Sequence, residues 1–292
     1  MTLGRIPHWF MATVAILGAG DIGGACAQVL ASSDSVRRVF LIDSAANAAQ
    51  GTALDIRQGG AIDGFHTELR GTDDQSLVAG CAACVVADRF AANSPEWSGE
   101  GALGLIKSIA ALAPEAPIVF AGATQADLIR LSSQELKVLP HRLIGAATEG
   151  LASAVAAIVA MEARCSPREV SVAVLGTPPA AFVIPWSEAS IGGYALERVL
   201  SQVQLRRIEA RVARLWPPGP FVLGVAAAHV VGALVQASRR TYNVLTVLAG
   251  EFGVRNRVAA VPALLSPRGI VSTRVPALNT RERVLLDTAL GV

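Results

Sequence analysis

The sequence has few charged residues. Asp, Glu, Lys and Arg make up 16% of the 292 residues, whereas about 25% is ordinary for a soluble domain. The net charge of +2 gives no reason to expect nucleic acid or an anionic membrane as a partner. A surface with so little charge favours burial of part of it between subunits, so we expect self-association.

Long apolar runs are also missing. The two most apolar stretches, 150–163 and 221–237, are shorter than the ~20 residues that cross a bilayer, and we interpret them as packed or interface helices. Residues 1–12 lack the apolar core of a secretory signal. We therefore expect a cytoplasmic protein with an N-terminal extension at 1–11, Met11 being an alternative start.

Cysteine is too scarce for a disulfide framework at this length. Of the four cysteines, Cys81 and Cys84 have CxxC spacing, but they lead into an apolar strand and no second pair completes a zinc site. We therefore predict buried structural thiols and no metal site.

The first half of the chain alternates short apolar runs with helical patterns. Strands are expected at 13–18, 38–43, 84–87 and 117–123, and helices at 23–33, 47–61, 103–116 and 126–136. Strands separated by helices of this length predict βαβ units and a parallel sheet.

The second half has a mixed α+β pattern, which places a domain boundary near residue 144 and gives domains 12–144 and 145–292. Helices are expected at 150–164, 196–215, 222–238 and 280–290, and β-rich stretches at 169–176, 180–186, 244–249 and 258–265. The helix at 196–215 repeats apolar residues at helical spacing. Arg206, Arg207, Arg211 and Arg214 of this helix are interpreted as a solvated face.

A GxGxxG motif, Gly18-Ala19-Gly20-Asp21-Ile22-Gly23, lies between the first expected strand and helix. In this context Gly18 permits the tight turn, Gly20 the close approach of a pyrophosphate and Gly23 the helix–strand contact. Asp21 and Ile22 lie within the motif and are expected to contact the cofactor, and the N-terminus of the helix beyond it presents free amides to the pyrophosphate. The motif therefore predicts a dinucleotide site; a glycine-rich turn that binds nothing is the alternative.

Asp43 ends the second strand, 20 residues after Gly23. A carboxylate there accepts hydrogen bonds from ribose hydroxyls and repels a 2′-phosphate, which favours NAD over NADP.

Several segments together resemble the lactate/malate dehydrogenase family, and bacterial malate dehydrogenases in particular. They are GAGDIGG with Asp43, QGTALDIRQGGAIDGF (50–65), GTDD (71–74), LPHRLIG (139–145), LAGEFGV (248–254), VPALLSPRGI and LNTRERVLLD. The resemblance covers nearly the whole chain. It implies a Rossmann doubly wound parallel sheet followed by an α+β substrate-type domain, and hydride transfer between NAD and a 2-hydroxy acid.

The same resemblance shows that the family's catalytic side chains are replaced. Pro178 stands where the family has its acid/base histidine, Leu151 and Ala154 stand for the aspartate and a substrate arginine, and Thr124 stands for an asparagine near the nicotinamide. A cofactor-side asparagine is replaced near Ala102. An arginine side chain holds a substrate carboxylate through two parallel hydrogen bonds, and an apolar side chain cannot replace it.

The family's mobile arginine loop corresponds to residues 88–102, where Arg89 is the only arginine. None of the four histidines, His8, His66, His141 and His229, takes the place of the missing base. His229, on an apolar helix, is interpreted as a packed core histidine. Glu149 and Arg164, or Asp88, Arg89 and Glu96, could form a new polar site, and these charges are equally well interpreted as surface.

The sequence therefore predicts a malate/lactate dehydrogenase-like NAD-binding protein without its catalytic residues, acting as a sensor, scaffold or assembly partner. A homodimer or a mixed oligomer with a related subunit is expected. Two alternatives stay open: an active NAD-dependent oxidoreductase with a rebuilt site for another substrate, and a structural subunit whose glycine loop is empty or blocked.

Overall fold

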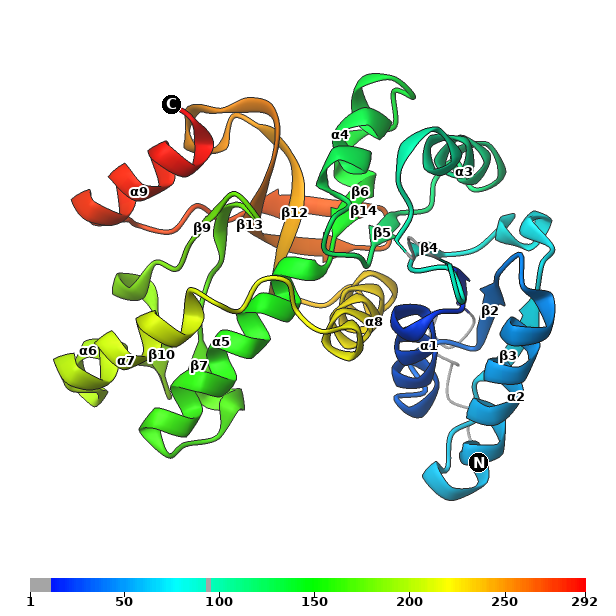
Figure 1. The fold of residues 1–292 in the computed structure, drawn as a ribbon, viewed down its shortest axis with the longest axis horizontal. Coiled ribbons are helices and arrows are strands. Elements are labelled where there is room, and N and C mark those ends of the chain that lie inside the picture. The colour runs from blue at the N-terminus through cyan, green and yellow to red at the C-terminus, as the bar shows by residue number, and fades with distance from the viewer. Residues whose placement is uncertain (1–11, 93–95) are drawn as a thin grey trace, which may run out of the picture.

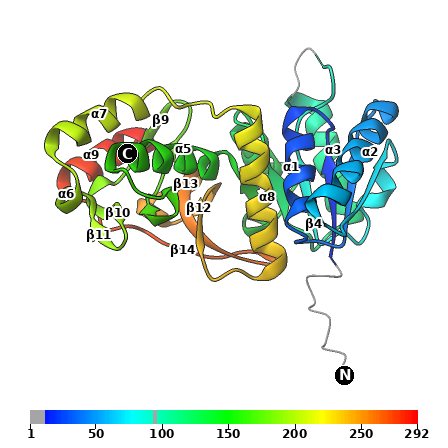
Figure 2. The ribbon, with the colours of Figure 1, turned by 90° about the horizontal axis from the view of Figure 1, so that it is seen from below.

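The computed structural model describes residues 12–92 and 96–292. The predicted extension at 1–11 lies outside the described residues. Viewed from below, as in Figure 2, the ribbon divides into an N-terminal lobe and a C-terminal lobe, with α8 between them.

The N-terminal half is a parallel sheet with helices on both faces, in the strand order β3-β2-β1-β4-β5-β6. This is the strand order of the Rossmann fold. The strands are β1 (Thr13–Leu17), β2 (Arg38–Ile42), β3 (Glu68–Thr72), β4 (Ala83–Val86), β5 (Ile118–Phe120) and β6 (Leu143–Gly145). The helices are α1 (Asp21–Ser32), α2 (Ala46–Asp63), α3 (Gly99–Leu112) and α4 (Ala126–Gln134). The central strands are uniformly apolar because helices bury both of their faces.

The same sheet continues into the C-terminal half through β12, which runs antiparallel to β6. The C-terminal strands are β7 (Val170–Ser171), β8 (Leu175–Thr177), β9 (Ala181–Val183), β10 (Ser190–Ile191), β11 (Tyr194–Ala195), β12 (Thr241–Ala249), β13 (Arg255–Ser266) and β14 (Gly269–Thr273). The helices are α5 (Ala147–Ala163), α6 (Leu196–Val199), α7 (Gln202–Val212), α8 (Pro220–Gln236) and α9 (Thr280–Leu290). The long hairpin β12–β13 lies at the centre of this lobe (Figure 1).

The predicted fold class is confirmed, and most predicted elements are found within a few residues of their expected bounds. One prediction is wrong: the single helix at 196–215 is two helices. Leu200 is extended and Ser201 begins α7 with a capping box to Gln204, so a strong helix start interrupts the run. Val199 and Val203, two of the apolar residues at helical spacing in this segment, are exposed. Arg206, Arg207, Arg211 and Arg214 are exposed, as predicted.

All four cysteines are free thiols. Cys26, Cys81 and Cys84 are buried, as predicted, whereas Cys165 is partly exposed. Burial raises the pKa of Cys26 to about 12 and that of Cys81 to about 11.

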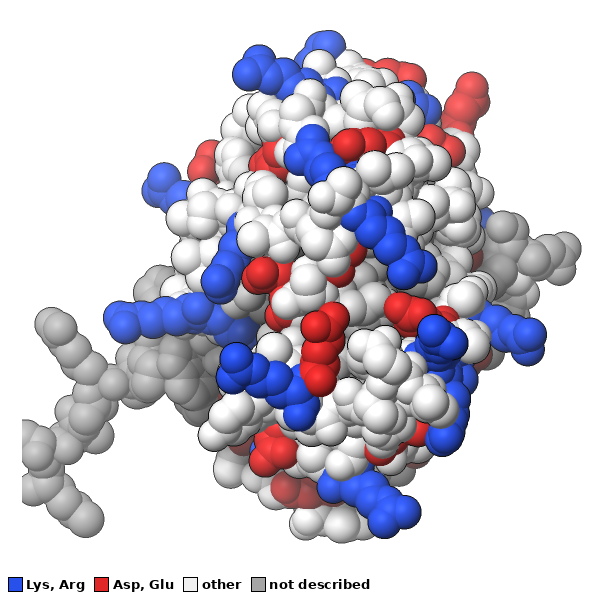
Figure 3. All heavy atoms as spheres, turned by 90° about the vertical axis from the view of Figure 1, so that its left-hand side faces the viewer, with Lys and Arg blue, Asp and Glu red and all other residues white. Residues whose placement is uncertain are grey.

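The charged side chains are dispersed. On the side of the molecule that lies to the left in Figure 1, basic and acidic groups alternate over a largely uncharged surface (Figure 3). Within the described ranges, no helix combines the length and hydropathy needed to cross a membrane. The same residues contain no group of three or more His, Cys, Asp and Glu side chains arranged to hold a metal ion.

Candidate cofactor site

The GxGxxG segment forms the turn from β1 into α1, at the carboxyl edge of the parallel sheet. Gly18 has a φ of +119°, a conformation that favours glycine. A Cβ at Gly23 would collide with the carbonyl oxygen of Gly18, so the turn closes tightly against the first helical turn. Asp21 and Ile22 begin α1. The five predicted cofactor-binding residues of this loop, Gly18, Gly20, Asp21, Ile22 and Gly23, thus lie together at the edge where α/β folds bind ligands.

Asp43 follows β2 at the same edge and is 5% exposed. Its Oδ2 accepts hydrogen bonds from the backbone N–H of Ala19 (2.8 Å) and Phe90 (3.0 Å), and its Oδ1 from Ala45 (2.9 Å). Burial alone would raise the pKa of Asp43, but the N–H donors outweigh it and hold the pKa below its ordinary value. Asp43 therefore joins the glycine loop to the segment after β4.

Asp88 lies two residues after the end of β4 and is also 5% exposed. Its Oδ1 accepts the backbone N–H of Ile22 at 3.0 Å and of Gly23 at 2.9 Å. Its carboxylate also lies where a Cβ on Gly20 would be, and its backbone oxygen accepts the N–H of Gly20 at 3.0 Å. Burial raises the pKa of Asp88, despite the N–H donors that lower it. The carboxylate thus occupies amides at the N-terminus of α1.

Glu96 makes a similar contact at the end of β5. Its Oε1 accepts the N–H of Ala123 at 3.0 Å, and its Oε2 accepts the N–H and hydroxyl of Thr124 at 2.8 and 2.5 Å. An isolated antiparallel bridge joins Asp88 to Glu96. The alternative interpretation as surface charge is therefore wrong for Asp88, which is buried, whereas Glu96 is half-buried and bound to backbone amides of the carboxyl edge.

A cavity of about 490 Å³ opens beside these contacts. Its lining comes from residues 20–22 of the glycine loop, residues 88–92 with Glu96, Ala123, and the segment 217–223 that leads into α8. The cavity is bounded by acidic and apolar groups, together with Arg89, whose guanidinium lies 5.0 Å from the centroid of the Trp97 ring.

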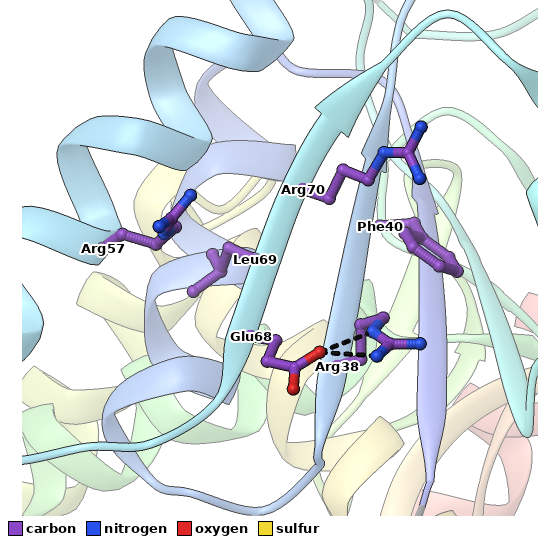
Figure 4. A pocket seen from close by; sticks show the side chains of 6 residues that line it. All are labelled: Arg38, Phe40, Arg57, Glu68, Leu69 and Arg70. Carbon is purple, nitrogen blue, oxygen red and sulfur yellow. Dashed lines mark hydrogen bonds and ion pairs between the residues drawn. The ribbon is translucent and has the colours of Figure 1, made fainter.

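A second cavity, of about 480 Å³, lies elsewhere on the N-terminal lobe, between β2, β3 and α2. Figure 4 shows Glu68 paired with Arg38, while Arg57 and Leu69 lie on the other side of β3. The pair is exposed, so it contributes little to stability. This cavity lies toward the amino ends of β2 and β3, whereas Asp43 follows the carboxyl end of β2, so it is not part of the cofactor site.

The residues that the sequence resemblance aligns with the family's catalytic positions are mostly enclosed. Leu151, on α5, is fully buried and belongs to the apolar core. Pro178 is buried after β8, Ala154 is partly exposed on α5, and Thr124 is exposed beside Glu96. Ala102, in α3, is fully buried.

The other polar candidates do not join this cluster. The carboxylate of Glu149 accepts hydrogen bonds from the backbone N–H and side-chain amide of Asn243, at 2.8 and 3.1 Å, and Arg164 is exposed at the end of α5. The prediction that His229 is a packed core histidine is wrong: it lies on the exposed face of α8. His66 and His141 are also exposed, and His8 lies outside the described residues.

The binding of Asp88 to α1 is the feature that the sequence analysis missed. A signal for it was present, because Asp88 lies two residues after a fully buried strand that neighbours β1. The carboxyl ends of parallel neighbours meet at one edge, so an acidic residue there had to lie near the glycine loop.

Comparisons with known proteins also indicate an NAD-binding domain in the N-terminal half. Residues 12–111 match the model of the lactate/malate dehydrogenase NAD-binding domain. A malate dehydrogenase of Thioalkalivibrio sulfidiphilus is 29% identical over 302 residues, covering 96% of this chain and 97% of that protein. A malate dehydrogenase of Cytophaga hutchinsonii is 27% identical, covering 94% of each chain.

Solved structures show the same fold. A malate dehydrogenase from Salinibacter ruber aligns with a TM-score of 0.85 at 21% identity, over 96% of this chain and 94% of that one. A minor L-lactate dehydrogenase from Enterococcus mundtii also gives a TM-score of 0.85, at 19% identity, over 97% and 96%. The N-terminal part of the chain is therefore an NAD-binding domain of the lactate/malate dehydrogenase type, whose cofactor is NAD, and the whole chain is similar to malate dehydrogenases over nearly its full length.

Proposed function

We propose that this protein is a catalytically impaired, malate/lactate dehydrogenase-like NAD-binding protein that acts as a sensor, scaffold or assembly partner. The observation that carries the proposal is the loss of the acid/base group: Pro178 stands where the family has a histidine. Oxidation of a 2-hydroxy acid releases a hydroxyl proton together with the hydride, and a group poised to accept that proton is needed. Proline has no side-chain proton to exchange.

The neighbouring replacements support the same conclusion. Leu151, in the place of the orienting aspartate, is fully buried in the core, and Ala154 cannot make the two parallel hydrogen bonds by which an arginine holds a carboxylate. Restoring one of these residues alone would not restore activity, because the effects of residues that act as a catalytic unit are not additive.

The alternative is an active NAD-dependent oxidoreductase with a rebuilt site for another substrate. The cavity beside the glycine loop favours it, because Asp88, Arg89 and Glu96 contribute to its lining. The full-length relatives named malate dehydrogenase also support an oxidoreductase. In this case one of these groups would serve as the acid or base.

We further propose that the protein is cytoplasmic and forms a homodimer or pairs with a related subunit. Its low charge content supports association. The outer face of α5 supports it too, since this helix leaves Ser153 and the small side chains of Ala154, Ala156 and Ala157 at least partly exposed, and Met161 is 59% exposed.

Activity is tested by following NADH absorbance with malate or lactate and millimolar NAD, beside a malate dehydrogenase such as that of Salinibacter ruber as a positive control. We expect no turnover above the blank, whereas an ordinary dehydrogenase turns over at ~10 per second. A rate within a few tenfold of that value would overturn the proposal. Titration with NAD and NADH by calorimetry tests binding separately, with Asp43→Ala as the weakened control.

A further inference from the structure

We propose that Asp88 is an internal competitor for the pyrophosphate of NAD, so that the nucleotide binds only molecules in which this carboxylate has left the N-terminus of α1. The inference rests on the proposed function, a protein that binds NAD without turnover, and concerns how strongly it does so.

The groups that would bind the pyrophosphate are the first backbone amides of α1. The first amides of a helix have no partner within the helix, and with the helix dipole they attract an anion. In this chain two of those amides, Ile22 and Gly23, already donate to Asp88 Oδ1 at 3.0 and 2.9 Å. A pyrophosphate oxygen needs the same donors.

Asp88 also occupies the space that a diphosphate needs beside Gly20. The absence of a side chain at Gly20 lets a diphosphate approach the loop closely. Here the carboxylate of Asp88 fills the volume that this glycine leaves open. A diphosphate would therefore meet a negative charge at contact distance, and like charges placed together oppose binding strongly.

The segment that begins at Asp88 also contacts Asp43, the residue expected to hold the ribose. The N–H of Phe90, two residues after Asp88, donates to Asp43 Oδ2 at 3.0 Å. Asp43 is 5% exposed in this arrangement. The segment that begins at Asp88 thus covers both the phosphate-binding amides and the carboxylate expected to hold the ribose.

Further contacts hold this segment against the sheet edge. Glu96 binds the amides of Ala123 and Thr124, and Trp97 Nε1 donates to the carbonyl oxygen of Leu17 at 3.3 Å. Burial opposes the ionised form of Asp88 where it lies against α1. Apparent affinity then scales with the fraction of molecules in which it is displaced.

The test is calorimetric titration of the full-length protein with NAD, using wild type, Asp88→Ala, Asp88→Asn and the control Asp55→Ala. Asp55 is an exposed carboxylate on α2. We expect the dissociation constant for NAD to fall by about tenfold or more in Asp88→Ala, and to be unchanged in Asp55→Ala. Inorganic pyrophosphate is the second probe, and it should bind Asp88→Ala more tightly than wild type.

Equal or weaker NAD binding by both Asp88 variants would overturn the inference, as would no binding by either of them. Asp88→Asn keeps the side-chain shape, so it serves as the test if Asp88→Ala fails to fold. These binding results need no hydroxy acid. They are therefore distinct from the turnover assay, in which malate or lactate oxidation would overturn the proposed function.

Discussion

Gly224 of α8 lies against the carbonyl oxygen of Ile22 in α1. A Cβ at Gly224 would be 2.5 Å from that oxygen and 2.6 Å from the Cβ of Ala25. The two helices therefore pack backbone to backbone (Figure 2), and a helix of the C-terminal half supports the turn that carries the phosphate-binding amides.

We expect Gly224→Ala to lower the free energy of unfolding by about 1–3 kcal/mol, because a well-packed contact tolerates no added carbon. Gly232→Ala on the same helix is the matched control. A Cβ there meets nothing within 4 Å, so it should raise stability by ~0.5–1 kcal/mol through helix propensity. Urea unfolding of the two variants checks this, and equal effects would contradict the packing argument.

Asp43→Asn should destabilise the protein by about 2 kcal/mol at pH 7, since an amide loses one acceptor oxygen and leaves buried N–H donors unsatisfied. The pKa of Asp43 is lowered in the folded state. Its contribution is therefore present above the ordinary pKa of ~3.9 and is lost as the pH falls through the folded value. Urea midpoints measured from pH 7 down to pH 3 should converge between wild type and variant only below pH ~4. Asp55→Asn should show no such convergence.

The substitution Asp88→Asn should change stability at pH 7 in the opposite direction. The pKa of Asp88 is raised by burial, so its ionised form costs stability once the pH rises above the ordinary value of ~3.9 and through the folded one. We expect the variant to be more stable than wild type at pH 7, with the difference shrinking as the pH falls toward 4. A variant less stable than wild type at pH 7 would show that the two N–H donors outweigh burial.

Thiol labelling should distinguish Cys165 from the other cysteines. Cys26 and Cys84 are fully buried, and burial raises the pKa of both thiols, which suppresses the reactive thiolate. Ellman's reagent at pH 8 should therefore modify about one thiol per native chain, and all four after denaturation. Cys165→Ser should abolish the native reaction, and persistent labelling in that variant would contradict the burial of the other three.

Much of the fold could be predicted from the sequence because the strands of the sheet centre are short apolar runs between helices. The strands that escaped prediction have weaker patterns. β3, at the sheet edge, exposes Glu68 and Arg70 on one face, so its apolar content is low. β6 has only three residues, which is too short for a periodicity argument.

The site was predictable only in part. The glycine loop and Asp43 have a known spacing, whereas the position of Asp88 depends on which strands are neighbours. Spacing along the chain does not contain that information, because Asp88 lies 65 residues from Gly23. The exposure of His229 was unpredictable for a related reason: an apolar helix packed between two lobes still leaves one face in solvent.

The sheet has one further consequence. At Gly145, β6 pairs with Leu245 of β12, and a Cβ on that glycine would be 2.7 Å from the Cβ of Leu245. The backbone ladder thus runs without interruption from the nucleotide-type half into the other half. Separating the chain after β6 would not give two independently folded domains. It would leave an open, apolar strand edge on the first of them, and such an edge invites pairing with other chains. The two halves are therefore one mechanical unit, in which the unfolding of either exposes the other.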